Sequence, residues 1–225
     1  MKKTTDGKCL FCGNSFSKQS MKKHLDKCGM KTSEYTSKDA EKAERYFCIS
    51  VQGYYDPNYW LYIDMPSNST IKVLDNFLRS IWLECCGHAS SFNVGEQTYS
   101  TIPDREYGDR SMNIKLDSVV GIGTSLRYEY DFGSTTTLKV KITSEFYANK
   151  RKNKVKLLAR NIQPEITCSS CKNLASYVCS QCIYDGTGWV CDECADKHEC
   201  GEEMLLPVVN SPRVGVCAYE GGCYD

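Results

Sequence analysis

The sequence predicts an α+β fold, in which a largely antiparallel sheet carries one packed helix and a small cysteine-rich module lies at each end. Every second residue is apolar from Phe47 to Val51 and again from Tyr59 to Met65, the pattern of strands with one buried face. From Ile71 to Cys85, apolar residues recur every three or four positions, which is typical of an amphipathic helix. Clustered cysteines near both ends predict the flanking modules.

The other elements of the middle part are shorter. Gly95 and Glu96 suit the turn of a hairpin between residues 88–94 and 97–102. Further strands are expected at residues 126–131, 138–142 and 155–159, a short helix at residues 37–45, and a short helix or turn at residues 114–120.

The chain has 28 basic and 28 acidic side chains, so its formal net charge is zero, but the charges are segregated. Residues 1–45 hold 11 Lys and Arg against 6 Asp and Glu, and residues 150–160 hold 6 against none. Residues 161–225 have the opposite balance, with 3 basic and 10 acidic side chains. With the motifs below, this segregation predicts four parts: a finger (1–30), a connector (31–45), a middle domain (46–162) and a C-terminal module with an apolar tail (163–225).

The finger contains the spacing Cys-x2-Cys-x11-His-x3-Cys, formed by Cys9, Cys12, His24 and Cys28. This pattern resembles a small CCHC-type zinc finger. His24 and Cys28 are four residues apart on one face of a helix, which suits two ligands of one ion. Because so short a segment cannot build its own core, bound zinc would supply most of its stability.

Eight further candidate ligands lie within 33 residues near the end of the chain. They are three Cys-x2-Cys pairs followed by a His and a Cys, namely Cys168, Cys171, Cys179, Cys182, Cys191, Cys194, His198 and Cys200. A Cys-x2-Cys pair lets a tight turn aim two thiolates at one ion, and eight ligands suffice for two tetrahedral zinc ions. The twelve ligands together predict three zinc ions per chain, with disulfides as the alternative.

The expected compartment favours metal over disulfides. The first residues, MKKTTDGKCLFCGNSF, are basic but lack the apolar stretch of a signal peptide, and no run of about 18 apolar residues predicts a membrane span. We therefore expect a cytoplasmic protein that does not enter membranes. In a reducing compartment, clustered cysteines are more often metal sites than disulfides.

Basic residues of the finger helix and of residues 150–160 predict contact with nucleic-acid phosphates. The candidates are Lys22, Lys23, Arg151 and Lys152. A solvated helix face is the alternative for the finger, and a charged edge that blocks strand association is the alternative for residues 150–160. A single finger reads about 3 base pairs, too few for specific recognition of DNA unaided.

The middle domain resembles a known family. Residues 126–142, LRYEYDFGSTTTLKVKI, are similar to the Tyr-Asp-Phe-Gly strand-and-turn signature of the root-inducing-plasmid ORF-three-like family, and residues 87–99 are similar to its His-containing hairpin. Its members occur on plasmids, in transposons as passenger genes, and in many bacterial and archaeal genomes. The resemblance implies no established activity. Many members continue the signature with Asp, Trp and His, where this chain has Ser134, Thr136 and Leu138.

The C-terminal module resembles B-box modules, with an apolar residue before the third cysteine pair and a His four residues after it. The resemblance implies interleaved ligation, in which Cys168, Cys171, Cys191 and Cys194 hold one ion and Cys179, Cys182, His198 and Cys200 hold the other. Sequential ligation along the chain is the alternative. The acidic balance of this module favours a protein partner over phosphate.

No catalytic or cofactor-binding residue is predicted, because the sequence lacks a Gly-rich phosphate loop, a Gly-x-Ser-x-Gly elbow and a His-Glu-x-x-His motif. His88 and Asp131 are interpreted as structural, Cys85 and Cys86 as core or half-buried thiols, and Cys217 and Cys223 stay outside the ligand sets. We predict a non-enzymatic zinc-binding adaptor of a mobile-element or plasmid-related family, joining nucleic acid to a protein partner. A purely protein-interacting factor, or an enzyme with a site in the middle domain, is the alternative.

Overall fold

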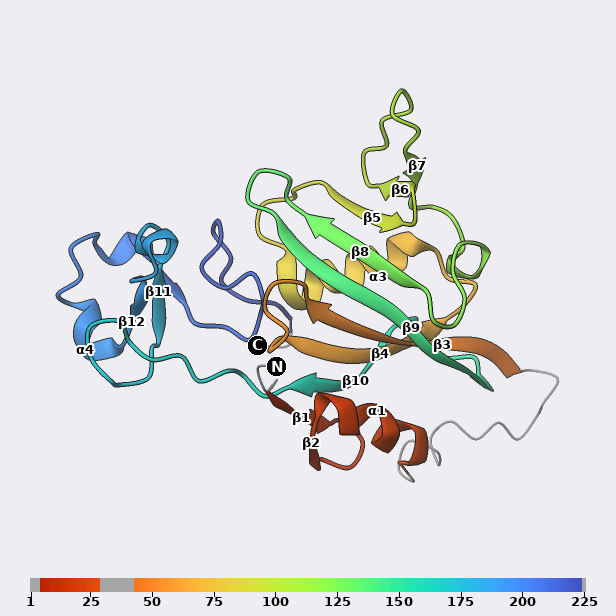
Figure 1. The fold of residues 1–225 in the computed structure, drawn as a ribbon, viewed down its shortest axis with the longest axis horizontal. Helices are drawn as coiled ribbons and strands as arrows, with labels where there is room; N and C mark the ends of the chain where they lie inside the picture. Colours follow the sequence, from red (N-terminus) through yellow and green to blue (C-terminus); the bar gives the residue numbers. More distant parts are fainter. Residues whose placement is uncertain (1–4, 29–42, 224–225) are drawn as a thin grey trace.

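The computed structural model describes residues 5–28 and 43–223, which form a large sheet and a small one (Figure 1). The large sheet has ten strands in the order β2-β1-β10-β4-β3-β9-β8-β5-β6-β7. Its neighbouring strands are antiparallel except β6 and β7, which are parallel. The small sheet has three strands in the order β12-β11-β13.

The strands of the large sheet are β1 (Asp6–Cys9), β2 (Ser15–Ser17), β3 (Ala43–Gly53), β4 (Trp60–Pro66), β5 (Ser90–Val94), β6 (Gln97–Ser100), β7 (Arg110–Ser111), β8 (Ser125–Tyr130), β9 (Thr136–Asn149) and β10 (Lys156–Asn161). Those of the small sheet are β11 (Tyr177–Cys179), β12 (Trp189–Val190) and β13 (Leu205–Pro207). The α-helices are α1 (Lys18–Lys27), α3 (Ile71–Leu78) and α4 (Asp192–Ala195). A π-helical turn, η2 (Arg79–Leu83), and the 3₁₀ turns η3 (Leu116–Ser118), η4 (Cys182–Asp185) and η5 (Glu202–Met204) complete the described elements.

The predicted α+β class is wrong, because the structure is mostly β, with 36% of the described residues in strands and 18% in helices. The helix expected from Ile71 to Cys85 is only eight residues long in α3 and then widens into η2, so no helical layer comparable with the ten-stranded sheet forms. Residues 43–45, expected at the end of a connector helix, begin β3 and pair with the end of β9. The rest of that expected helix lies outside the described residues.

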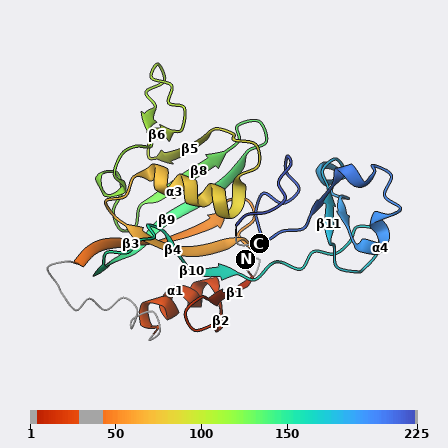
Figure 2. The same cartoon turned by 180° about the vertical axis from the view of Figure 1, so that it is seen from behind.

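One face of the large sheet carries the main core. The alternating residues from Phe47 to Val51 on β3 and from Leu61 to Met65 on β4 are almost completely buried there. Ile71, Leu74 and Leu78 of α3 belong to the same apolar cluster, and Figure 2 shows α3 crossing this side of the sheet.

The finger covers the opposite face and extends the sheet. Met21 and Leu25 of α1 form a second buried cluster with Trp60 and Tyr62, so β4 is buried on both faces. Strand β1 pairs with β10, and a Cβ atom on Gly7 would collide with the Trp60 ring and the backbone of β10. Only glycine therefore lets β1 lie this close to the sheet.

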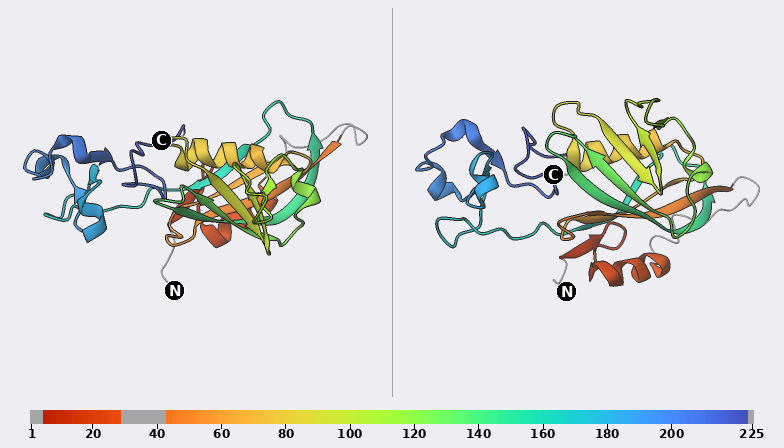
Figure 3. Two further views of the ribbon diagram at one scale, coloured as in Figure 1. Left: turned by 90° about the horizontal axis from the view of Figure 1, so that it is seen from above. Right: turned by 45° about the horizontal axis from the view of Figure 1, so that its top comes forward.

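The C-terminal module lies to one side of the large sheet (Figure 3). After β13 the chain returns to the middle domain, and we call residues 210–223 the tail. The tail donates a hydrogen bond from Ser211 Oγ to the Trp82 carbonyl (2.6 Å) and inserts Arg213, whose side chain is fully buried. Within residues 5–28 and 43–223, no helix has the length and apolar character needed to cross a membrane.

Candidate metal centres

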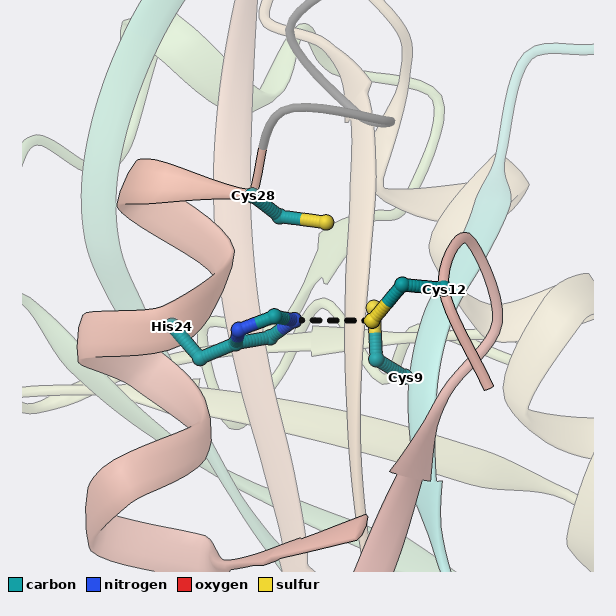
Figure 4. Close-up of side chains that lie close together, drawn as sticks. All are labelled: Cys9, Cys12, His24 and Cys28. Carbon is teal, nitrogen blue, oxygen red and sulfur yellow. Dashed lines mark hydrogen bonds between the residues drawn. The ribbon is translucent and has the colours of Figure 1, made fainter. Parts of the chain in front are cut away.

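The four finger residues converge on one point, with their ligand atoms all within 4.8 Å of one another (Figure 4). Cys9 ends β1, Cys12 lies in the following turn, His24 projects from α1, and Cys28 is the C-cap of that helix. The Sγ atom of Cys12 lies 3.3 Å from Nε2 of His24. Three thiols and one imidazole at this separation can enclose one metal ion.

Local structure positions the four ligands. The turn between the two cysteines closes with a hydrogen bond from the Gly13 N–H to the Cys9 carbonyl (2.9 Å), and Gly13 has φ of 73°, which favours glycine. Ser17 caps α1 by accepting a hydrogen bond from the Ser20 N–H. Phe16 stacks on the His24 ring with 4.1 Å between ring centroids and so orients the imidazole.

The eight C-terminal candidates form two groups in space, and the grouping is the interleaved one. The first and third cysteine pairs come together, with 3.6 Å between the Sγ atoms of Cys171 and Cys191. The second pair meets His198 and Cys200, with 3.5 Å between the Sγ atoms of Cys182 and Cys200. Strand β11 ends at Cys179, the first ligand of the second group, and α4 starts directly after Cys191 of the first.

Each C-terminal group contains one acidic thiol. Burial raises the pKa of Cys168, but backbone N–H groups of Cys191, Ser170 and Cys171 outweigh it and lower that pKa to about 6. The pKa of Cys179 is also about 6, because N–H groups of its loop and the His198 ring outweigh the effect of burial. Thiolates bind metal and thiols do not, so these two residues are ready to bind an ion at neutral pH.

The structure reveals a fourth group that the sequence did not predict. The ligand atoms of Cys85, Cys86, His88 and Cys217 also lie within 4.8 Å of one another. The first three follow η2, and the last comes from the tail. The local signal was the Cys-Cys-x-His run, but the fourth ligand is so far away in sequence that spacing alone cannot connect it.

All fifteen cysteines are free thiols, so disulfides do not account for the clusters. Four Cys/His groups could therefore hold metal ions. Each group offers four ligands, the number that closes a tetrahedral site, whereas a catalytic zinc site keeps one position for water or substrate.

The basic candidates differ in their surroundings. Lys22, Lys23 and Lys152 are exposed. Arg151 instead forms an ion pair with the buried Asp64, and its guanidinium lies 4.6 Å from the centroid of the Tyr46 ring. A buried carboxylate requires a charged partner. We therefore interpret Arg151 as a structural residue in the first place and as a phosphate ligand only in the second.

The finger lies directly beside the basic strip (residues 150–160). A groove of about 460 Å³ lies where they meet. It is lined by Leu10 on the finger side and by Arg151, Lys152, Lys156 and their neighbours on the other. The Lys156 ammonium lies 4.8 Å from the centroid of the Phe11 ring, and the Leu10 N–H donates to the Leu158 carbonyl (2.9 Å). The basic strip and the apolar turn of the finger thus form one surface, although they are distant in sequence.

Lys18, the first residue of α1, has a lowered pKa of about 8, caused by burial and then by the charge of Lys139. The unfolded chain therefore binds more protons than the folded protein between about pH 8 and 10.4, and stability should rise with pH across this window. We expect Lys18→Met to increase the free energy of unfolding at pH 7 by on the order of 2 kcal/mol and to remove most of that rise. Urea denaturation across the window, with the exposed Lys22→Met as control, would test this. Equal pH dependence in both variants would contradict it.

His88 and Asp131 lie close together, and Asp131 has clear structural contacts. Its Oδ1 atom accepts hydrogen bonds from the N–H groups of Gly133 (3.0 Å) and Ser134 (3.2 Å), and its Oδ2 atom accepts from Arg213 (2.7 Å). With both oxygens engaged, this carboxylate stabilises the turn after β8 and the tail together.

Comparisons with known proteins add little to this picture. No family model matches the sequence, and no curated protein matches it. Among solved structures, the chain is similar to a crystal structure of a protein of unknown function, MM3350, from Methanosarcina mazei Go1, with 16% identity and a TM-score of 0.45. The similarity covers 52% of this chain and 69% of that one.

Proposed function

We propose that the protein is a non-enzymatic, zinc-stabilised adaptor that binds a nucleic-acid backbone at the finger and a protein partner at the C-terminal module. The observation that carries this proposal is the groove between Leu10 and the basic strip, because it places the cationic side chains of Lys152 and Lys156 beside the finger. The resemblance to plasmid and transposon proteins fits such a role.

In this proposal, the finger and the two groups of the C-terminal module each hold one zinc ion. Both ligand sets, three thiolates with one imidazole and four thiolates, are typical of structural zinc. In such a site the four protein ligands complete the coordination of the ion. The ions would fix parts of the chain that contain few buried apolar side chains. Within residues 163–209, for example, the buried apolar side chains apart from the cysteines are Val178, Val190, Leu206 and Val209.

The two ends of the molecule suit different partners. The exposed lysines of α1 and of the basic strip would contact phosphates, whose neutralisation releases counterions. The C-terminal module has an excess of acidic residues, which repel phosphate and favour a basic protein surface. The adaptor would thus hold its two partners at different parts of the chain.

Salt dependence tests the nucleic-acid half of this proposal. Three or four phosphate contacts should give a slope of about −3 when the logarithm of the binding constant for duplex DNA is plotted against that of salt concentration. The triple variant Lys22→Glu, Lys152→Glu, Lys154→Glu should abolish this binding and retain its zinc, because none of the three is a candidate ligand. Fluorescence titration with duplex DNA and with RNA measures both effects.

Arg151 is left intact in this design, because breaking its ion pair with the buried Asp64 would destabilise the protein by about 3–5 kcal/mol. The matched control is Arg105→Glu, Arg110→Glu, Lys115→Glu, which reverses three exposed charges outside the finger and the basic strip. Equal loss of binding in both variants would show that binding depends on the net charge of the protein and not on a specific site. An absence of wild-type binding at about 50 mM salt would leave the purely protein-interacting factor.

A further inference from the structure

We propose that Cys85, Cys86, His88 and Cys217 bind a fourth zinc ion, which fastens the tail to the middle domain. The three sulfur atoms and the imidazole come from two segments: residues 85–88 follow the π-helical turn η2, and Cys217 lies in the tail. Cys86 and Cys217 are 131 positions apart, so one ion would close a very long loop of chain.

The distances match those of the predicted zinc groups. Sulfur ligands of tetrahedral zinc lie about 2.3 Å from the ion and hence about 3.8 Å from each other. The Sγ atoms of Cys86 and Cys217 are 3.7 Å apart, and Cys217 Sγ is 3.7 Å from His88 Nε2. In the C-terminal module the corresponding distances are 3.8 Å for Cys171 and Cys194 and 3.7 Å for Cys182 and His198.

Hydrogen bonds hold the ligand loop in place. The Arg79 guanidinium donates to the His88 carbonyl (2.9 Å), and the Gly87 N–H donates to the Glu84 carboxylate (2.7 Å). Gly87 has φ of 75°, a conformation that favours glycine and lets the chain turn between Cys86 and His88. The loop therefore presents its ligands in a defined arrangement, which lowers the entropic cost of binding an ion.

The surrounding charges suit a site with three thiolates. Three thiolates and one Zn²⁺ carry a net charge of −1, and the buried Arg213 places Nη2 3.4 Å from Cys85 Sγ. The same guanidinium is paired with Asp131 at 2.7 Å, which fixes its position beside Cys85. Such outer partners orient metal ligands and tune their charge. A disulfide between Cys86 and Cys217 would explain neither Cys85 nor His88.

Zinc content measures this site directly. Protein purified under reducing conditions should lose one zinc per chain when Cys86→Ser and Cys217→Ser are combined, relative to wild type. Cys223→Ser is the matched control, because Cys223 is an exposed tail cysteine that belongs to none of the four groups, and it should lose none. Circular dichroism would verify that both variants remain folded.

Alkylation of the wild-type protein provides a second measurement. Cys86, Cys217 and Cys223 are all exposed, so without metal all three should react with iodoacetamide. With zinc bound, Cys86 and Cys217 should be protected and Cys223 should not, as peptide mass mapping would show. Unchanged zinc content in the double variant, or a Cys86–Cys217 disulfide in the wild-type protein, would overturn the proposal. Neither result depends on whether the other three groups are filled or whether nucleic acid binds.

Discussion

Removal of zinc is expected to unfold the C-terminal module while the large sheet stays folded. The module has strands of only two or three residues and four buried apolar side chains beside its cysteines, too little to fold unaided. Structural zinc contributes on the order of 10 kcal/mol to the folding of small domains, more than such a core can replace. The strands β3 and β9, by contrast, are paired over eleven residues and lie on the main core.

Hydrogen exchange followed by mass spectrometry would measure this difference. After treatment with a chelator and a reducing agent, amides of β11, β12 and β13 should exchange rapidly and those of β3 and β9 slowly. Amides of the finger should exchange at intermediate rates, because β1 pairs with β10 and α1 packs on Trp60 and Tyr62 of the sheet. Returning Zn²⁺ should restore protection. Persistent protection of β11 in the metal-free protein would contradict the structural role of zinc.

Replacing Arg213 with alanine should be the most damaging single substitution in the tail. Its side chain is fully buried and pairs with the nearly buried Asp131 at 2.7 Å. Removing one partner of a buried ion pair leaves an uncompensated charge, which costs about 3–5 kcal/mol. Urea denaturation of the zinc-loaded protein, followed by tryptophan fluorescence, would report the change, since Trp60 and Trp82 are both fully buried.

Arg127→Ala is the matched control. Arg127 pairs with Glu129 at a similar distance of 2.8 Å, but 47% of its side chain is exposed. Exposed ion pairs contribute about 0–1 kcal/mol, so this variant should change stability little. If both variants lost the same stability, burial of the Arg213 pair would not be what stabilises the tail.

Sequence patterns identified groups of residues that are close in the chain. The spacing within each Cys-x2-Cys pair selected the residues that the structure brings together in the finger and in the C-terminal module. The alternation from Phe47 to Val51 likewise identified the face of β3 that is buried. Both patterns depend on local geometry, which a short window of sequence contains.

Features that depend on distant parts of the chain were missed. The charge of Arg151 was visible, but its partner Asp64 lies 87 positions away. Cys85, Cys86 and His88 gain their fourth neighbour only when the tail returns to the middle domain. The fold class was wrong because helical spacing from Ile71 to Cys85 does not reveal that the finger adds two strands to the sheet and that β5 to β7 extend its other end.

Two asparagines mark the place where the C-terminal module leaves the sheet and where the chain comes back. Asn161 Nδ2 donates to Asn210 Oδ1 (2.7 Å), and Asn210 Nδ2 donates to the Asn161 carbonyl (2.9 Å). The residues between them thus form an insertion whose ends are held together. Because the entropy of closing a loop grows only with the logarithm of its length, an insertion with fixed ends can gain or lose residues at little cost to the rest of the fold. Evolution could therefore exchange one binding surface for another at this position and keep the same sheet.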